Sequence, residues 1–188
     1  MRTRVYGRDD IPAAAELIRA GGLVAVPTET VYGLCCNGLN EEAVKEIYEL
    51  KGRPEVKPLS LMVHDFSAAE RYCRDIPAAA YALAERFLPG PLTIILPSKD
   101  NVPSIVRAGG DTVGIRGPDH PLTLELLREL DLPMAGPSAN PSGAPSPKNA
   151  QTVLNYFSGS IRGVYKPGCE LFKKRIECAI MMKAAELD

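Results

Sequence analysis

The chain has 188 residues, 45% of them hydrophobic, and its 22 Lys and Arg nearly balance 23 Asp and Glu, for a net charge of −1. This length predicts one sizeable core and a single domain over residues 1–188. The near-neutral charge excludes a protein covered in positive potential, so any contact with nucleic acid would need a local basic patch. No apolar run approaches the roughly 18 residues of a membrane span. Charged residues interrupt the first apolar stretch, so no signal peptide is expected and the predicted location is cytoplasmic.

The cysteines argue against a metal centre. There are five, an odd number, none in a C-x-x-C pair, and only His64 and His120 could join them as ligands. Reduced, mostly buried thiols are therefore expected, and no metal site is predicted. The adjacent Cys35 and Cys36 would project to opposite sides of an extended strand.

Apolar and polar segments alternate along the chain in a pattern that predicts strands and helices in turn. Asp10 is placed to cap a helix that ends before Gly21, and Asn40 to cap a second helix, Glu41 to Leu50. The other expected helices cover residues 67–74, 77–87, 122–130 and 148–157, and the expected strands cover residues 23–26, 59–63, 92–96, 112–116 and 132–135. This order predicts an α/β domain in layers.

Three cations lie just before the strand expected at residue 59. Lys51 and Arg53 end a helix that Pro54 stops, and Lys57 follows them. Cations late in a helix can simply complement its dipole. Their clustering at one strand entrance favours phosphate binding, for which arginine offers a rigid fork and lysine a mobile charge.

Hydroxyl groups follow the first strand. Thr28, Thr30 and Tyr32 stand within six residues after Val26, with Glu29 among them. Threonine is also an ordinary strand residue. Hydroxyls beyond a strand end, however, face the crevice in which open α/β sheets bind ligands. Glu29 is either a capping carboxylate or a salt-bridge partner, and its role stays open at this point.

A third polar segment contains Ser138, Asn140, Ser142 and Ser146 between prolines and glycines. No G-x-S-x-G elbow is present, so a serine nucleophile is disfavoured. Ordinary turn chemistry is one interpretation. The other is a loop that hydrogen-bonds a phosphate, a ribose or an amino acid.

Arg116 closes the strand expected at 112–116, and Gly117-Pro118 follows as a turn. It is the fourth cation near a predicted strand end. Neither a Walker A loop nor a G-x-G-x-x-G after a strand occurs in the sequence. A nucleotide would therefore have to bind through this less common arrangement.

Five of these segments, in this order, resemble the YrdC/Sua5 family, the L-threonylcarbamoyladenylate synthases of tRNA modification. They are P-T-E-T-V-Y-G-L (27–34), K-G-R-P (51–54), P-G-P-L-T (89–93), R-x-P-x-H-P (116–121) and P-S-A-N-x-S-G (137–143). The match covers about residues 23–160 and leaves a divergent tail, 161–188. The resemblance implies a twisted mixed sheet flanked by helices, with a concave basic cavity.

The resemblance also implies a reaction. L-threonine, bicarbonate and ATP give threonylcarbamoyl-AMP and pyrophosphate, with Mg²⁺ carried by ATP, and the product serves t⁶A37 modification of tRNA by downstream t⁶A-transferase proteins. The threonine carbamate attacks the α-phosphate, so the protein contributes positioning and electrostatic stabilisation. Lys51 and Arg53 would be catalytic, and Thr30, Arg116 and Ser138 would bind threonine. The residues implied around ATP are Arg53, Lys57, Thr112, Asn140 and Ser146.

Two departures from the family pattern stand out. Methionine occupies position 62, where archaeal members often place a histidine. Cys178 and Ala179 stand where the family has a Ser-Thr pair, so we predict a low turnover that rises when Cys178→Ser and Ala179→Thr are combined. The second, smaller domain of Sua5 proteins is also not found in this sequence.

Two other functions remain open at this point. One is an RNA-binding or ribosome-associated module with weak or no adenylating activity, favoured by the basic tail and in contact with tRNA or double-stranded RNA. The tail cations are Lys166, Lys173, Lys174, Arg175 and Lys183. The other is a carbamoyl-transfer enzyme that acts on a different amine.

Overall fold

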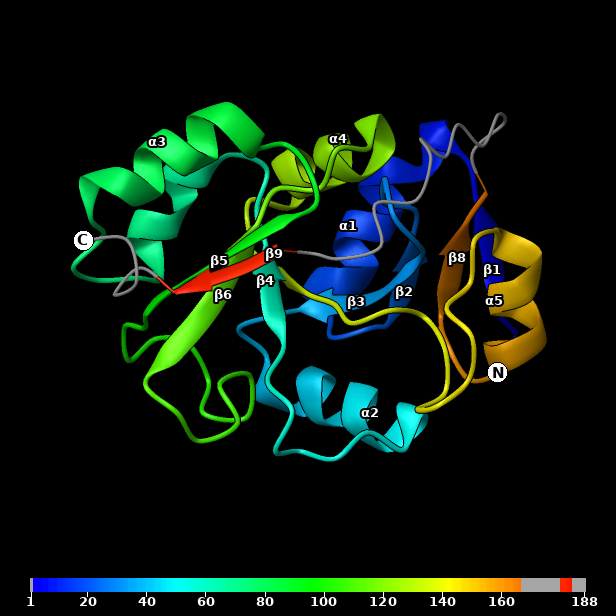
Figure 1. Cartoon of the computed structure of the whole chain (residues 1–188). Helices are drawn as coiled ribbons and strands as arrows, with labels where there is room; N and C mark the ends of the chain where they lie inside the picture. The colour runs from blue at the N-terminus through cyan, green and yellow to red at the C-terminus, as the bar shows by residue number, and fades with distance from the viewer. Residues whose placement is uncertain (1, 167–179, 184–188) are drawn as a thin grey trace.

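The computed structural model describes residues 2–166 and 180–183, and its strands form one sheet in the order β1-β8-β2-β3-β7-β4-β6-β5-β9 (Figure 1). The strands are β1 (Arg4–Tyr6), β2 (Val24–Val26), β3 (Gly33–Asn37), β4 (Ser60–Met62), β5 (Leu92–Pro97), β6 (Thr112–Arg116), β7 (Met134–Ala135), β8 (Gly163–Tyr165) and β9 (Ile180–Lys183). The helices are α1 (Ile11–Arg19), α2 (Glu41–Lys51), α3 (Ala78–Phe87), α4 (Pro121–Leu130) and α5 (Ala150–Phe157), with 3-10 turns η1 (Arg8–Asp10) and η2 (Phe66–Arg71).

The sheet is mixed, and this decides which segments share an edge. β2 pairs antiparallel with β3, β3 with β7, and β7 with β4, whereas β4 and β6 are parallel. It follows that β4 and β6 begin at the edge where β2 and β7 end. The loops after β2 and β7 therefore lie at the same edge as the residues that precede β4.

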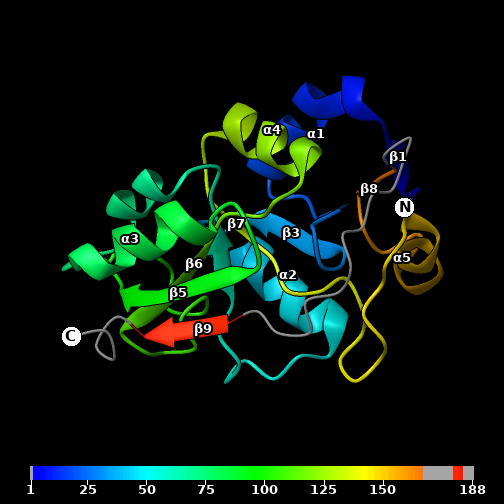
Figure 2. The same ribbon diagram turned by 45° about the horizontal axis from the view of Figure 1, so that its top comes forward.

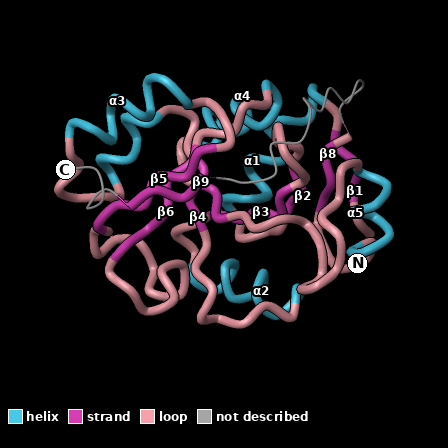
Figure 3. Tube along the Cα trace, in the orientation of Figure 1, coloured by secondary structure: helices cyan, strands magenta, loops and turns pink. Residues whose placement is uncertain are grey.

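Helices cover both faces of the sheet, as Figures 1 and 2 show. On one face, α1 and α4 pack together through side chains such as Ile18 and Leu126, over Val26 of β2. On the other face, α2 buries Val44 and Ile47 against Leu61 of β4. The tube in Figure 3 shows how short the strands are compared with the loops that join them. The architecture confirms the predicted α/β class with a twisted mixed sheet flanked by helices.

The adjacent cysteines of β3 reach opposite faces of the sheet, as an extended strand requires. Cys35 packs with the α1–α4 side and Cys36 with the α2 side, and both are buried thiols. Burial raises the pKa of each thiol, so both are held in the protonated form at neutral pH.

The ends of the helices confirm one predicted cap and correct another. The Asn40 side chain accepts a hydrogen bond from Ala43 N at 3.1 Å, and α2 ends at Gly52 in the left-handed conformation (φ 58°). Asp10 precedes α1 as expected, but its carboxylate accepts from Gly7 N and from Arg4 Nη2, both at 2.8 Å. The Asp10 side chain therefore ties α1 to the segment before it rather than capping the helix.

Most differences from the expected elements concern short pieces of chain. β1, β3, β8 and β9 were not predicted, and the helix expected at 67–74 is the 3-10 turn η2. β3 starts inside the segment expected to be a polar loop, because Gly33 and Leu34 pair with Val26 and Ala25. No helix within the described residues is long and apolar enough to cross a membrane.

Candidate functional site

The loop after β2 and the loop after β7 are fastened to each other by backbone hydrogen bonds. Tyr32 N donates to Pro147 O at 2.9 Å, and Ala139 N donates to Tyr32 O at 2.8 Å. Gly33 and Ser138 also form an isolated antiparallel bridge. Two of the predicted polar segments, about a hundred residues apart in sequence, therefore form one surface.

Thr28 uses its hydroxyl to hold the shape of the first loop. Thr28 Oγ1 donates to Val31 O at 2.6 Å and accepts from the backbone N–H groups of Thr30 and Val31. Its side chain is buried, and its oxygen lies 3.1 Å from Thr30 Oγ1. This local turn sets the position of the Thr30 hydroxyl.

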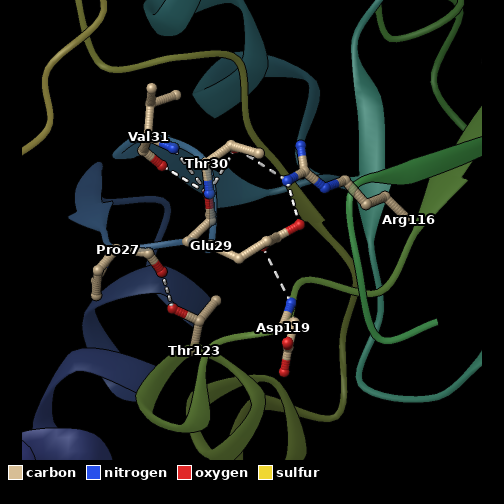
Figure 4. A network of polar contacts seen from close by, with 8 residues as sticks. Pro27, Glu29, Thr30, Val31, Arg116, Asp119 and Thr123 are labelled. Carbon is tan, nitrogen blue, oxygen red and sulfur yellow. Dashed lines mark hydrogen bonds and ion pairs between the residues drawn. The ribbon is translucent and has the colours of Figure 1, made fainter. Parts of the chain in front are cut away.

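Arg116 joins this loop from β6 and makes the central ion pair of the site (Figure 4). Arg116 Nη2 lies 2.6 Å from Glu29 Oε1 and also donates to Thr30 Oγ1 at 3.1 Å. The two charged side chains are 15% and 7% exposed. The other Glu29 oxygen accepts from Asp119 N at 3.0 Å. Glu29 is thus a salt-bridge partner, which resolves the role that its sequence position left open.

A second contact, below the ion pair in Figure 4, joins the start of this loop to α4. The buried Thr123 of α4 donates through Oγ1 to Pro27 O. It lies on the same stretch of chain as Asp119, and neither residue was singled out from the sequence. The 27–30 segment is therefore anchored to α4 and the turn before it at two points.

The Lys51 side chain is buried and already makes hydrogen bonds within the protein. Its side chain is 4% exposed, and Nζ donates to the backbone carbonyls of Ser138 and Asn140. In addition, Ser142 N donates to Lys51 O at 2.7 Å. Burial, with a smaller contribution from Arg53, lowers the pKa of Lys51 to about 8. Lys51 therefore fastens the loop after β7 to the end of α2.

Asn140 lies within the loop that Lys51 holds. Its Nδ2 donates to Ala144 O at 2.7 Å and to Pro141 O at 3.0 Å. Its Oδ1 is buried and has no hydrogen-bond partner among the described residues. Because an unpaired buried acceptor is costly, this oxygen is a candidate to receive a ligand donor.

The remaining predicted nucleotide residues lie at or near the same edge but more exposed. Arg53 donates to Lys57 O at 3.3 Å and to Pro58 O at 3.1 Å, which orders the turn before β4. Lys57 is exposed, as are Thr112 at the start of β6 and Ser146. Within the described part of the chain, the side chains of Thr112 and Ser146 make no hydrogen bond. The structure therefore joins Thr30 to Arg116, and Lys51 to Ser138 and Asn140, by direct contacts. Arg53 instead contacts the turn before β4, and Thr112 stands at the opposite end of β6 from Arg116.

The two departures noted in the sequence have different outcomes. Met62 is buried in β4 and packs on the α1–α4 side of the sheet with Val26 and Cys35. Cys178 and Ala179 lie outside the described residues, so the prediction for the tail stays a prediction. The concave basic cavity also stays a prediction.

Metal ligands do not gather in the described residues. Among residues 2–166 and 180–183, no group of three or more His, Cys, Asp or Glu side chains lies together in a way that could hold an ion. A magnesium ion carried by ATP would need no such group, because substrate phosphates can supply its ligands.

Comparison with known proteins agrees with this arrangement of loops. The model of the Sua5/YciO/YrdC family, described as "Telomere recombination", matches residues 16–178. The threonylcarbamoyl-AMP synthase of Bacillus subtilis is 50% identical over 159 residues, which are 84% of this chain and 46% of that protein. The threonylcarbamoyl-AMP synthase of Pseudomonas paraeruginosa is 36% identical over 151 residues, 80% of this chain and 81% of that protein.

The fold agrees with the sequence matches. The crystal structure of Sua5 from Pyrococcus abyssi complexed with L-threonine has a TM-score of 0.90 and 41% identity, over 96% of this chain and 54% of that one. The chain thus spans about half the length of the Bacillus and Pyrococcus proteins. These matches, and the described loops that carry the motifs, establish that the chain belongs to the Sua5/YciO/YrdC family.

Proposed function

We propose that this chain is an L-threonylcarbamoyladenylate synthase, a nucleotidyltransferase that makes threonylcarbamoyl-AMP and pyrophosphate from L-threonine, bicarbonate and ATP. The names of its relatives support this activity, and so does the L-threonine bound to the Pyrococcus Sua5. The product would serve t⁶A37 modification of tRNA through downstream t⁶A-transferase proteins in the cytoplasm.

The observation that carries the proposal is the joining of Arg116 to the threonine-rich loop. Arg116 contacts Thr30 at 3.1 Å, and Ser138 lies across the bridge from Gly33. A guanidinium and two hydroxyls at one place match the carboxylate and hydroxyl of threonine. Arg116, Thr30 and Ser138 are therefore proposed to hold the amino acid.

The nucleotide would lie over the adjacent edge. Arg53, Lys57, Thr112 and Ser146 present cations and hydroxyls there, and Asn140 contributes its unpaired Oδ1. Lys51 holds the loop and adds positive charge beneath it. A magnesium ion bound to the ATP phosphates would neutralise part of their charge.

The chemistry needs no protein nucleophile. Threonine's amine takes up CO₂ as a carbamate, a carbamate oxygen attacks the α-phosphorus, and the bond to pyrophosphate breaks. The residues of the site would orient the two substrates and stabilise charge on the phosphoryl oxygens. The names of the relatives support an enzyme over an RNA-binding module, and contact with tRNA remains a separate question.

A pyrophosphate-release assay tests the proposal. Purified chain is incubated with ATP, Mg²⁺, bicarbonate and L-threonine, and each substrate is omitted in turn. Release that requires both bicarbonate and threonine, with threonylcarbamoyl-AMP identified by mass spectrometry, supports the activity. Release independent of threonine would contradict it, and retention of RNA without any adenylation would favour the module.

A further inference from the structure

The Glu29–Arg116 pair has features that a stabilising surface contact lacks. Both side chains are largely buried, and the two oxygens of Glu29 are used on different partners: Arg116 Nη2 at 2.6 Å and Asp119 N at 3.0 Å. One carboxylate therefore ties the end of β6, the turn after it and the 27–32 loop together (Figure 4). A surface ion pair would contribute little to such an arrangement, whereas a buried one fixes geometry.

The nitrogens of the Arg116 guanidinium differ in their hydrogen bonding. Nη2 has two hydrogens and two acceptors, Glu29 Oε1 and Thr30 Oγ1. Nε, in contrast, is buried and has no partner within the described part of the chain. A buried N–H without an acceptor costs stability, so its presence beside a charged pair points to an acceptor other than the residues that the structure describes.

We propose that Glu29 is a positioning residue: it holds the Arg116 guanidinium so that its Nε–H is directed at the carboxylate of the amino-acid substrate. This inference rests on the proposed function, which it deepens. Glu29 does not touch the substrate in this arrangement. It acts through Arg116, because the two contacts of Nη2 prevent rotation of the planar group and so fix the direction of Nε–H, the buried donor that has no partner among the described residues.

The charge of Glu29 makes the proposal sharply testable. If Glu29 affected the substrate only through its negative charge, then Glu29→Gln would strengthen binding of an anion at Arg116, because a repulsive charge is removed. If Glu29 positions Arg116, the same change weakens binding, because a neutral amide holds the guanidinium less firmly. The two effects have opposite signs.

The experiment is calorimetric titration of the full chain with L-threonine and, separately, with ATP. We expect Glu29→Gln to weaken threonine binding at least tenfold and to change ATP affinity less than threefold. Glu29→Asp keeps the charge but is one methylene shorter, so it should also weaken threonine binding. In an Arg116→Lys background, which lacks the planar fork, Glu29→Gln should change threonine affinity less than twofold.

Thr123→Val is the matched control. It removes the hydrogen bond from α4 to Pro27 O without touching Arg116. We expect it to lower the melting temperature and to leave threonine affinity within twofold. Equal or tighter threonine binding by Glu29→Gln would overturn the proposal, as would a parallel loss of threonine and ATP affinity that Thr123→Val reproduces. If the unaltered chain binds no threonine, the proposed function itself fails; if it binds threonine and Glu29→Gln binds it equally well, only the role of Glu29 fails.

Discussion

At the scale of single residues, Lys51 and Arg53 were predicted together from one short motif but have different surroundings. The Lys51 ammonium is buried against two backbone carbonyls, whereas the half-buried Arg53 contacts carbonyls in its own turn. The sequence alone predicts that either change to alanine weakens nucleotide binding without unfolding the protein. The structure keeps that expectation for Arg53 and alters it for Lys51.

Lys51→Met should therefore destabilise the fold as well as the site. The methionine keeps most of the buried stem but leaves the carbonyls of Ser138 and Asn140 without their donor. We expect a loss of about 1–3 kcal/mol in the free energy of unfolding by urea denaturation. Arg53→Ala, the comparison, should lower ATP affinity about tenfold in calorimetry and change stability by less than about 1 kcal/mol. Equal stability of Lys51→Met and the unaltered chain would mean that the loop does not depend on this ammonium.

The pKa of Lys51 predicts a pH dependence of stability. Burial lowers this pKa from 10.5 to about 8, so between these values the unfolded chain binds more protons than the folded one. The shifted pKa of Lys51 should therefore lower the free energy of unfolding, and this loss should be complete below pH 8. The free energy of unfolding should recover as pH rises from about 8 to 10.5. The gain is at most about 3 kcal/mol, since one pKa unit corresponds to about 1.4 kcal/mol.

Urea denaturation of the unaltered chain and of Lys51→Met at pH 7, 8, 9 and 10 checks this expectation. The raised pKa of Tyr165, caused mainly by burial, acts in the opposite direction at high pH, but it is common to both proteins. The difference between the two stabilities isolates Lys51. A difference that stays constant across this range would show that Lys51 does not titrate there.

At the scale of elements, the strand β8 depends on the absence of a side chain at Gly163. This residue lies between β1 and β2, opposite Arg4 and Val24. A Cβ at this position would lie 2.1 Å from Tyr6 Cε2, and the Tyr6 ring is itself buried 5.6 Å from the ring of Tyr165. The edge of the sheet therefore closes only because β8 leaves room for that ring.

Gly163→Ala should cost about 1–3 kcal/mol of stability, because the buried ring must move out of its position. Gly7→Ala is the control, since a Cβ there meets nothing closer than 3.7 Å. In a Tyr6→Ala background, the Gly163→Ala change should cost much less stability than it does alone. Denaturation of the unaltered chain, the two single variants and the double variant measures this coupling. Equal costs in both backgrounds would show that the Tyr6 ring is not the obstacle.

At the scale of the whole molecule, the site joins parts of the chain that are far apart in sequence. The 27–32 loop, the end of α2, the end of β6 and the 136–147 loop are held together by the contacts of Glu29, Lys51 and Tyr32. A ligand bound across these segments stabilises the native arrangement and not the unfolded chain.

Threonine at one hundred times its dissociation constant should therefore stabilise the fold by about 2.7 kcal/mol, which raises the melting temperature by roughly 5–10 °C for a chain of this size. Valine has nearly the same shape but lacks the hydroxyl, so at the same concentration its effect should be much smaller. Thermal unfolding with each amino acid measures both effects. Equal shifts with the two amino acids would be evidence against a polar pocket for the side chain.

The amino-acid sequence by itself determined the class of fold, most helices and the segments that form the site. These follow from local causes: Asn40 caps α2 and Gly52 ends it. The spacing of apolar residues that is typical of helices and strands can likewise be recognised from each segment by itself. Short strands such as β1 and β8 escaped prediction, because three residues carry too little pattern and their pairing is between distant segments.

Only the tertiary structure decided what each polar residue does. Arg116 stands at the opposite end of β6 from Thr112, and strand direction places that end at the edge of the sheet where β2 begins. Its side chain nevertheless contacts Glu29 and Thr30 in the loop after β2, a contact that the order and direction of the strands do not predict. The motif predicted that Lys51 supplies charge beside a nucleotide, and the structure adds that its Nζ donates to two backbone carbonyls of the loop after β7. From the sequence, Glu29 could be either a helix cap or an ion-pair partner. Its contact with Arg116, at the end of β6, shows that it is an ion-pair partner. Hydrogen-bond partners of this kind depend on the distance between residues in the folded structure, and that distance cannot be read from their separation along the chain.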